Sequence, residues 1–461
     1  MYFFLNPVFI SRIIKGYVTE IDRMWRLNYE QIKKYQNRAF RKTVKNAFHT
    51  KLYKEKYKQA GVKPDDIKTV HDISKLPFVS KEDIRKYSPD GLVSSNFDKT
   101  RAIINYTSGT TGKPLSIYFD LYTIYKSVLG LIRVLKEHNV KWNKTKIVII
   151  PDYSENTIET EYFRGGIMPH IKPFFKLNNI KDFHTYDDPK RVLQEIDKFQ
   201  PEFLGGYPGM LRQLAILKKN GYGKNVNPRV IVSTGGILGK FTKEYIKEAF
   251  STEVYDFYGA TETGPIAFEC RNKKYHIFSD FNYIEVLDDK NQPVSSDKLG
   301  HIVTTRLYGK ATPIIRYTGL DDIVKLSDEK CNCGLSGELL EKIYGRENKS
   351  IVLPDGKIIL PSTLWDFLGE IVYKNDVKYV ERVQVIQKTL RKIEILIKIK
   401  KNQKETIPIV DRLFTVIKNE FEKTFNTDIE VQVKEKEKFK PHDPPVISEI
   451  DVKKIENKIY I

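Results

Sequence analysis

Cysteine, methionine and tryptophan are scarce in this chain, with three, four and three residues among 461. Three cysteines are too few for a disulfide-stabilised fold in a chain of this length, and they fit a reducing compartment such as the cytoplasm. No stretch approaches the roughly 18 apolar residues that a membrane-spanning helix needs. The opening MYFFLNPVFISRII has no leading positive region and no small-residue cleavage site. We therefore expect a cytoplasmic protein without a transmembrane segment, whose first residues pack as a helix on their own domain.

Acidic residues are outnumbered: 59 Asp and Glu face 78 Lys and Arg, which gives a formal net charge of +19. Such a charge attracts polyanions, anionic lipid headgroups or phosphorylated substrates, although a lysine-rich composition also fits an AT-rich coding genome. No nucleic-acid recognition motif accompanies the charge, so we expect no specific nucleic-acid partner. Hydrophobic residues make up 40% of the chain, which excludes wholesale disorder.

The pattern of predicted helices and strands changes twice along the sequence, and this predicts an α/β protein with three regions. Residues 1–100 show apolar positions at helical spacing, with Ser80 as a helix N-cap. Residues 101–345 alternate short β-rich runs with helices. Residues 346–461 predict a small α+β domain with strands near 380–389, 392–400 and 428–435 and a helix near 408–424. The clearest runs of the middle region are KIVIIP (146–151), RVIVSTGG (229–236), EVYDFYG (253–259) and HIVTTRLY (301–308).

The most specific string is YTSGTTGKPL, residues 106–115. Glycines let backbone N–H groups approach an anion, hydroxyls donate hydrogen bonds and a lysine supplies charge, so the string predicts a phosphate-binding loop. It is not a P-loop of the GxxxxGK[ST] type, because two residues separate its glycines and a proline follows its lysine. The residues concerned are Thr107, Ser108, Gly109, Thr110, Thr111, Gly112 and Lys113.

This string resembles the phosphate loop of the adenylate-forming superfamily, whose members activate carboxylates with ATP. Further motifs follow in that family's order: STGG at 233–236, YGATETG at 258–264, RYTGLDD at 316–322 and GR at 345–346. With LPFVSKEDIRKY, FEC, CNCG and VISEI, the chain is most similar to the phenylacetate–CoA ligase branch, including its relatives in polysaccharide biosynthesis. The resemblance implies a large N-terminal domain that includes the helical region, and a small mobile C-terminal domain.

The resemblance also implies a nucleotide site. Glu262 would hold Mg²⁺, and Thr107 would share its catalytic role. Tyr258 would lie against adenine, and Gly235 and Gly236 would let the backbone pass close to it. Thr261 and Thr263 would lie near phosphate, Gly259 would also contribute to nucleotide binding, and Arg346 would reach the nucleotide from the domain junction.

Two acidic residues compete for the ribose hydroxyls. Asp321 is preferred, since a carboxylate accepts two O–H donors at once. The family pattern is usually RYRTGD, however, and RYTGLD displaces TG by one residue, so Asp322 stays open.

The C-terminal catalytic lysine of the family is also ambiguous. The tail EKEKFKPHDPPVISEI differs from strings such as SGKFRPVISEI. Lys438 is preferred if HDP is an insertion, Lys440 comes second, and a gapless fit would place His442 there.

The three cysteines and one histidine suggest a metal site. Cys270, His276, Cys331 and Cys333 resemble positions at which this branch carries cysteine and histidine, and they would complete a tetrahedral structural Zn²⁺ site. Three reduced thiols beside a turn are the alternative.

The leading hypothesis is an ATP- and Mg²⁺-dependent ligase that converts a small carboxylic acid into an acyl-adenylate and passes the acyl group to CoA. Transfer to an amine or hydroxyl of a sugar or carrier is the alternative, and a non-catalytic nucleotide-binding relic is another. Tyr153, Phe203, Tyr207 and Tyr258 could line an acyl pocket, although each is individually typical of a core. A homodimer is compatible with these features.

Overall fold

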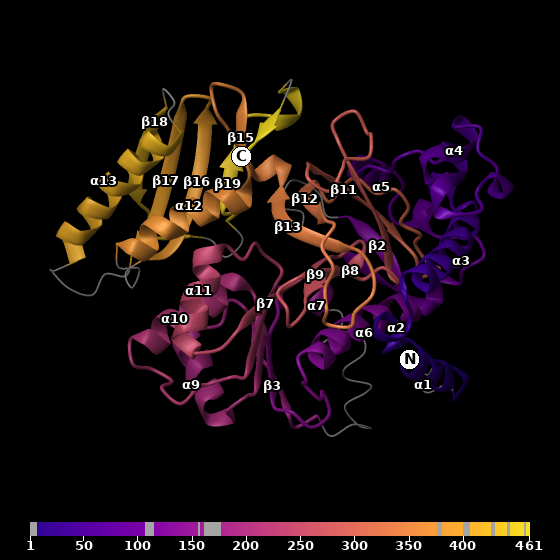
Figure 1. Cartoon of the computed structure of the whole chain (residues 1–461), viewed down its shortest axis with the longest axis horizontal. Coiled ribbons are helices and arrows are strands. Elements are labelled where there is room, and N and C mark those ends of the chain that lie inside the picture. Colours follow the sequence, from indigo (N-terminus) through magenta and orange to yellow (C-terminus); the bar gives the residue numbers. More distant parts are fainter. Residues whose placement is uncertain are drawn as a thin grey trace.

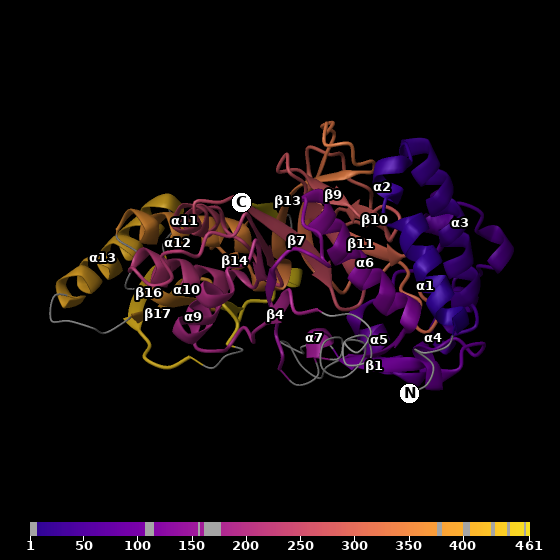
Figure 2. The same cartoon turned by 90° about the horizontal axis from the view of Figure 1, so that it is seen from below.

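The computed structural model describes residues 7–106, 115–154, 157–160, 177–375, 380–399, 406–425, 429–439, 443–455 and 458–461. The expected mixture of helices and strands is confirmed. Figure 1 shows the N-terminal helices and the C-terminal sheet at opposite ends of the molecule, with the large sheet between them. Figure 2 shows the same order from below. Among the described residues, no helix has the length and apolarity needed to cross a membrane.

Short helices make up the N-terminal region. Ser80 is the N-cap of one of them, as expected: Asp83 N donates to Ser80 Oγ at 3.1 Å, and Ser80 N donates to the Asp83 carboxylate at 2.8 Å. The α-helices of this region are α1 (Pro7–Glu20), α2 (Arg23–Arg26), α3 (Tyr29–Ala47), α4 (Lys51–Gln59) and α5 (Lys81–Tyr87). Its 3₁₀ turns span Pro64–Asp66, Val70–Lys75, Asp90–Leu92 and Lys99–Arg101.

One eleven-stranded mixed sheet forms the centre of the molecule. Its parallel half runs in the order β4 (Ile180–Asp182), β3 (Ile147–Ile150), β5 (Phe203–Gly206), β6 (Val230–Thr234) and β7 (Val254–Ala260). Its antiparallel half continues from β7 with β8 (Gly264–Glu269), β9 (Tyr275–Ile277), β13 (Leu339–Arg346), β12 (Asp322–Ser327), β11 (Leu299–Arg306) and β10 (Asn282–Leu287). The β-rich runs expected in this region are therefore confirmed as strands.

Helices cover the parallel half because its strands are apolar on both faces. Leu204 and Ile231 from the sheet share one core with Leu214 and Ile246 from the helices. A separate hairpin of β1 (Ala102–Tyr106) and β2 (Ser116–Asp120) precedes the sheet. The helices of this region are α6 (Leu121–Glu137), α7 (Ile158–Thr160), α9 (Pro189–Phe199), α10 (Pro208–Lys219) and α11 (Lys240–Phe250).

The C-terminal residues form a small α+β unit, and its expected strands and helix are confirmed. A four-stranded sheet runs in the order β18 (Glu430–Glu435), β17 (Lys392–Ile399), β16 (Val380–Thr389) and β19 (Val446–Ser448). Its helices are α12 (Pro361–Lys374) and α13 (Thr406–Phe425), and β14 (Ile351–Val352), β15 (Lys357–Ile359) and β20 (Ile459–Tyr460) form a further three-stranded sheet.

The small unit rests against the helices of the large sheet. Arg212 Nη2 on α10 donates to the Val380 carbonyl at 3.0 Å, and Lys240 N donates to Asp366 Oδ1 at 2.5 Å. β13 ends at Arg346, beside the expected boundary at 345. The division into domains at that boundary stays a prediction.

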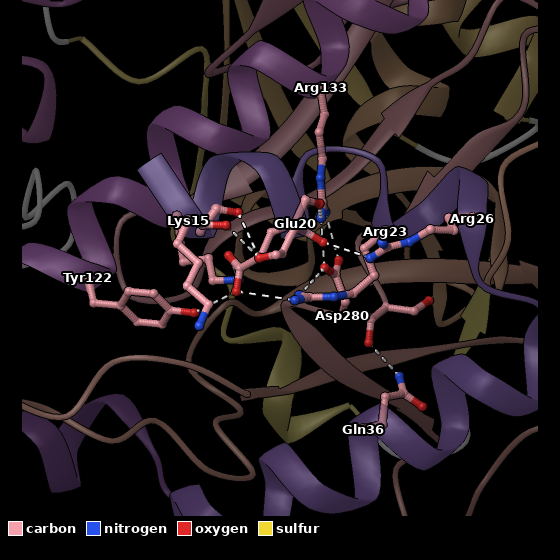
Figure 3. A network of polar contacts seen from close by, with 12 residues as sticks. Lys15, Glu20, Arg23, Arg26, Gln36, Tyr122, Arg133 and Asp280 are labelled. Carbon is pink, nitrogen blue, oxygen red and sulfur yellow. Dashed lines mark hydrogen bonds and ion pairs between the residues drawn. The ribbon is translucent and has the colours of Figure 1, made fainter. Parts of the chain in front are cut away.

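A buried ion network fastens the N-terminal helices to the large sheet (Figure 3). Arg133 on α6 forms two hydrogen bonds of 2.7 Å to the two carboxylate oxygens of Asp280, and Arg23 on α2 adds a third of 3.0 Å. Arg133 Nη2 also donates to the Glu20 carbonyl at 2.6 Å, and Lys126 pairs with the Glu20 carboxylate at 2.7 Å. Burial by itself would raise the pKa of Asp280, but Arg133, Lys126 and Arg23 together outweigh it and the pKa is lowered.

We expect Asp280→Ala to lower the free energy of unfolding by about 3–5 kcal/mol, because it leaves buried guanidinium groups without their carboxylate. Urea denaturation followed by circular dichroism measures this change. The exposed Asp65 provides the control, since Asp65→Ala should change stability by less than about 0.5 kcal/mol. Equal stabilities of the two variants would show that the network does not fasten the helices.

Candidate functional site

The first part of the site lies where the parallel strand β6 ends. Ligands of α/β sheets commonly bind at the carboxyl ends of such strands. Gly235 follows β6 with φ of +76°, and a Cβ at this position would come within 2.4 Å of the Tyr207 ring. Gly235 thus brings backbone close to an aromatic ring, in an arrangement that a larger residue would disrupt. The expected passage of the backbone beside adenine stays a prediction.

The turn between β7 and β8 holds the acidic residue of the YGATETG motif. The Glu262 side chain accepts a hydrogen bond of 3.0 Å from the Tyr317 hydroxyl, and Arg306 Nη1 donates to the Glu262 carbonyl at 2.9 Å. Glu262 is 6% exposed. Burial and the adjacent carboxylate raise the pKa of Tyr317, so the phenol stays a donor. One carboxylate oxygen is therefore held in place from a different segment of the chain.

Tyr258 on β7 forms a hydrogen bond with Asp322, the first residue of β12. The Tyr258 hydroxyl donates to Asp322 Oδ2 at 2.5 Å, and burial raises the pKa of the Asp322 carboxyl group. The antiparallel pairing of β12 and β13 sets Asp322 opposite Arg346. The structure thus brings Tyr258, Asp322 and Arg346, which the motifs had suggested separately, into one group.

Asp321 lies beside the residues that follow β13. It has a positive φ of +57°, and its carbonyl accepts from Glu347 N at 2.7 Å. Its carboxylate accepts from Asn348 Nδ2 at 3.3 Å and lies 3.6 Å from Lys453 Nζ. The Asp322 carboxylate instead accepts the hydrogen bond from Tyr258, and the two neighbouring acids interact electrostatically. The choice of Asp321 as ribose ligand stays a prediction.

Several expected site residues lie outside the described part of the chain. These are Thr107, Ser108, Gly109, Thr110, Thr111, Gly112 and Lys113, together with Lys440 and His442. The strands on either side of the phosphate loop pair through Tyr106 and Ser116. Lys438 is described and exposed, and it forms no ion pair with any other described residue. Its catalytic role stays a prediction.

The second cluster brings together Cys270 directly after β8, His276 on β9 and the two cysteines of the CNCG turn. Cys270 Sγ lies 3.6 Å from Cys331 Sγ, and Cys333 Sγ lies 3.2 Å from His276 Nε2. All four ligand atoms lie within 4.8 Å of one another. A tetrahedral ion with Zn–S distances of about 2.3 Å would separate its ligand atoms by roughly 3.8 Å, so the residues fit zinc. The structure thus brings together all four residues that the sequence singled out, and their binding of zinc stays a proposal.

Of the aromatic residues considered for an acyl pocket, Phe203 is buried in the core and the Tyr153 hydroxyl donates to Asp182 at 2.7 Å. The Tyr207 hydroxyl donates to Glu159 at 3.1 Å, and burial raises the pKa of Glu159 to about 7. Tyr207 is therefore the one of these three that also borders the nucleotide site, through Gly235.

Two features of the site are not predicted by the sequence. The Tyr317–Glu262 hydrogen bond joins residues 55 positions apart, and no spacing rule predicts it. Lys81 interacts electrostatically with Glu262, Asp321 and Arg346. It lies in LPFVSKEDIRKY, a motif that contributed to the family resemblance without suggesting a role for its lysine.

Comparisons with known proteins agree with this geometry. The family model of the AMP-binding enzymes matches residues 42–306. A phenylacetate–coenzyme A ligase of Pseudomonas putida is 27% identical over 316 residues, which cover 65% of this chain and 68% of that protein. Protein CapK of Staphylococcus aureus is 24% identical over 344 residues, covering 73% and 72%. The fold matches that of a 2-hydroxyisobutyryl-CoA ligase in complex with an adenylate, with a TM-score of 0.74, 17% identity and coverage of 93% and 91%. The chain therefore belongs to the family of AMP-binding enzymes, and its relatives support the resemblance to the phenylacetate–CoA ligase branch.

Proposed function

We propose that this protein is an ATP-dependent ligase that converts a carboxylic acid into an acyl-adenylate and transfers the acyl group to CoA. The observation that carries the proposal is the meeting of Glu262, Asp322 and Arg346, within a chain that belongs to the AMP-binding enzymes. The phenylacetate–CoA ligases among its relatives support an acid–CoA ligase and leave the identity of the acid open.

The adenylation step requires a carboxylate oxygen to attack the α-phosphate of ATP while pyrophosphate leaves. Both reactants are anions, so catalysis depends on orientation and on electrostatic stabilisation. Glu262 would hold Mg²⁺, which supplies charge neutralisation on the phosphates. Tyr317 fixes the Glu262 carboxylate through its 3.0 Å hydrogen bond. Asp321 or Asp322 would accept the ribose hydroxyls, and Arg346 would contact the nucleotide from the end of β13.

The cysteine cluster is proposed as a structural zinc site. Its four protein ligands leave no open coordination position for catalysis. Burial raises the pKa of the Cys270 and Cys333 thiols, a cost that a bound dication would offset by favouring the thiolates. Cys331 and Cys333 would thereby be tied to Cys270, which follows β8, and to His276 on β9; β8 pairs with β7, which leads into the Glu262 turn.

We expect the purified protein to exchange labelled pyrophosphate into ATP when a suitable carboxylic acid is present. Glu262→Gln should lower the exchange rate by about 10²–10³-fold, because it removes a charge that acts on the phosphates. Glu329→Gln is the matched control, since this exposed acid lies beyond β12 and should leave exchange unchanged. Absence of exchange across a broad panel of acids would contradict the proposed adenylation.

The acceptor is tested by offering CoA, amines and hydroxyl compounds to enzyme preloaded with the acid that supports exchange. Mass spectrometry should detect an acyl-CoA thioester as the main product. An amide or ester formed in preference to the thioester would replace CoA as the acceptor and leave the adenylation step intact.

Elemental analysis of the wild-type protein should find about one zinc ion per chain. Cys333→Ser should lose that zinc and lower the unfolding temperature, because one ligand of the tetrahedron is removed. His301→Ala is the control: His301 belongs to a second group, with Asp289 and Glu347, that could also hold a metal ion. A zinc content that survives Cys333→Ser would contradict the assignment.

A further inference from the structure

Lys81 is carried into the nucleotide site by a segment from the N-terminal region. Val79 N donates to the Arg316 carbonyl at 3.0 Å, and Thr318 N donates to the Val79 carbonyl at 3.0 Å. Val79 therefore forms a parallel bridge to Tyr317, the residue that holds Glu262. Lys81 follows two positions later, as the first residue of α5. Backbone pairing, and not a flexible loop, sets its position.

Lys81 has no ion-pair partner among the described residues, although Glu262 and Asp321 act on it electrostatically. Its neighbours on α5 are engaged elsewhere: Asp83 caps the helix and pairs with Lys56 at 2.8 Å, and Glu82 pairs with Arg85 at 3.3 Å. Burial lowers the pKa of Lys81, while Glu262 acts in the opposite direction from a distance. A half-buried ammonium group without a close partner would gain from a bound anion.

Two further cations share this region. Lys349 is half-buried in the 3₁₀ turn Glu347–Lys349, and its pKa is lowered by burial, by Arg346 and by Lys81. Among the described residues, neither Lys349 nor Arg346 forms an ion pair. Like charges without counter-ions disfavour each other, so the gathering of Lys81, Arg346 and Lys349 is typical of a site that binds a polyanion.

We propose that Lys81 is a catalytic residue of the adenylation step, whose ammonium group contacts the α-phosphate of ATP. This inference rests on the proposed ligase function. In the step, the acid's carboxylate oxygen bonds to the α-phosphorus, and the bond from that phosphorus to the bridging oxygen breaks. Pyrophosphate leaves with the electron pair, and Lys81 keeps its proton while stabilising the added negative charge. The family resemblance assigned a role of this kind to Lys438, which is exposed and whose catalytic role stays a prediction.

The experiment separates the two half-reactions in Lys81→Met, Lys81→Arg and the control Lys86→Met. Lys86 is exposed on the same helix, where its ammonium group lies 5.3 Å from the centre of the Tyr87 ring. Pyrophosphate exchange is measured with the acid that gives the fastest wild-type rate. Acyl transfer to CoA is measured separately, from the chemically prepared acyl-adenylate of that acid.

Lys81→Met should slow exchange by roughly 10²–10³-fold and change acyl transfer from the supplied adenylate by less than about threefold. Lys81→Arg should recover part of the exchange, and Lys86→Met all of it. The unfolding temperature of ligand-free Lys81→Met should stay equal or rise, since an unpaired half-buried charge is removed.

Wild-type exchange retained by Lys81→Met would overturn this inference alone. An equal loss in both half-reactions would also overturn it, because it would indicate a structural role. Absence of exchange in the wild-type protein would overturn the proposed function, and this inference with it.

Discussion

The candidate site depends on the backbone around Tyr317. Tyr317 exchanges two hydrogen bonds with Thr304 on β11, is bridged to Val79, and donates its hydroxyl to Glu262. A single buried tyrosine thereby joins the N-terminal region, the antiparallel half of the sheet and the acidic turn after β7. Because these contacts are buried, the relative positions of Lys81 and Glu262 are set by packing and hydrogen bonding together.

Charges are compensated in one part of the molecule and lack close partners in another. At the N-terminal helices, Asp280 is fully buried and its two guanidinium partners satisfy it directly. At the candidate nucleotide site, Lys81, Arg346 and Lys349 lack ion-pair partners among the described residues. The first arrangement fastens helices to the sheet and needs no ligand. The second leaves three cations without close counter-ions, which is what the proposed binding of ATP requires.

Much of the fold followed from periodicity and turn chemistry. The apolar runs at 229–236 and 253–259 became β6 and β7, and the hydroxyl of Ser80 capped α5 as expected. The cluster of Cys270, His276, Cys331 and Cys333 was also anticipated, because few residue types form such a site. Asp280 with Arg133 was not, since partners 147 positions apart leave no local pattern. Lys81 was missed for the same reason: its significance comes from the pairing of Val79 with Tyr317, which only the three-dimensional structure reveals.

A crystal structure of the protein with a non-hydrolysable acyl-adenylate analogue would test the proposed site directly. We expect the phosphate mimic to lie within hydrogen-bond distance of Lys81 Nζ, with adenine beside Gly235 and the ribose hydroxyls on Asp321 or Asp322. An analogue bound elsewhere in the molecule, or bound here with Lys81 turned away and another lysine on the phosphate mimic, would contradict it.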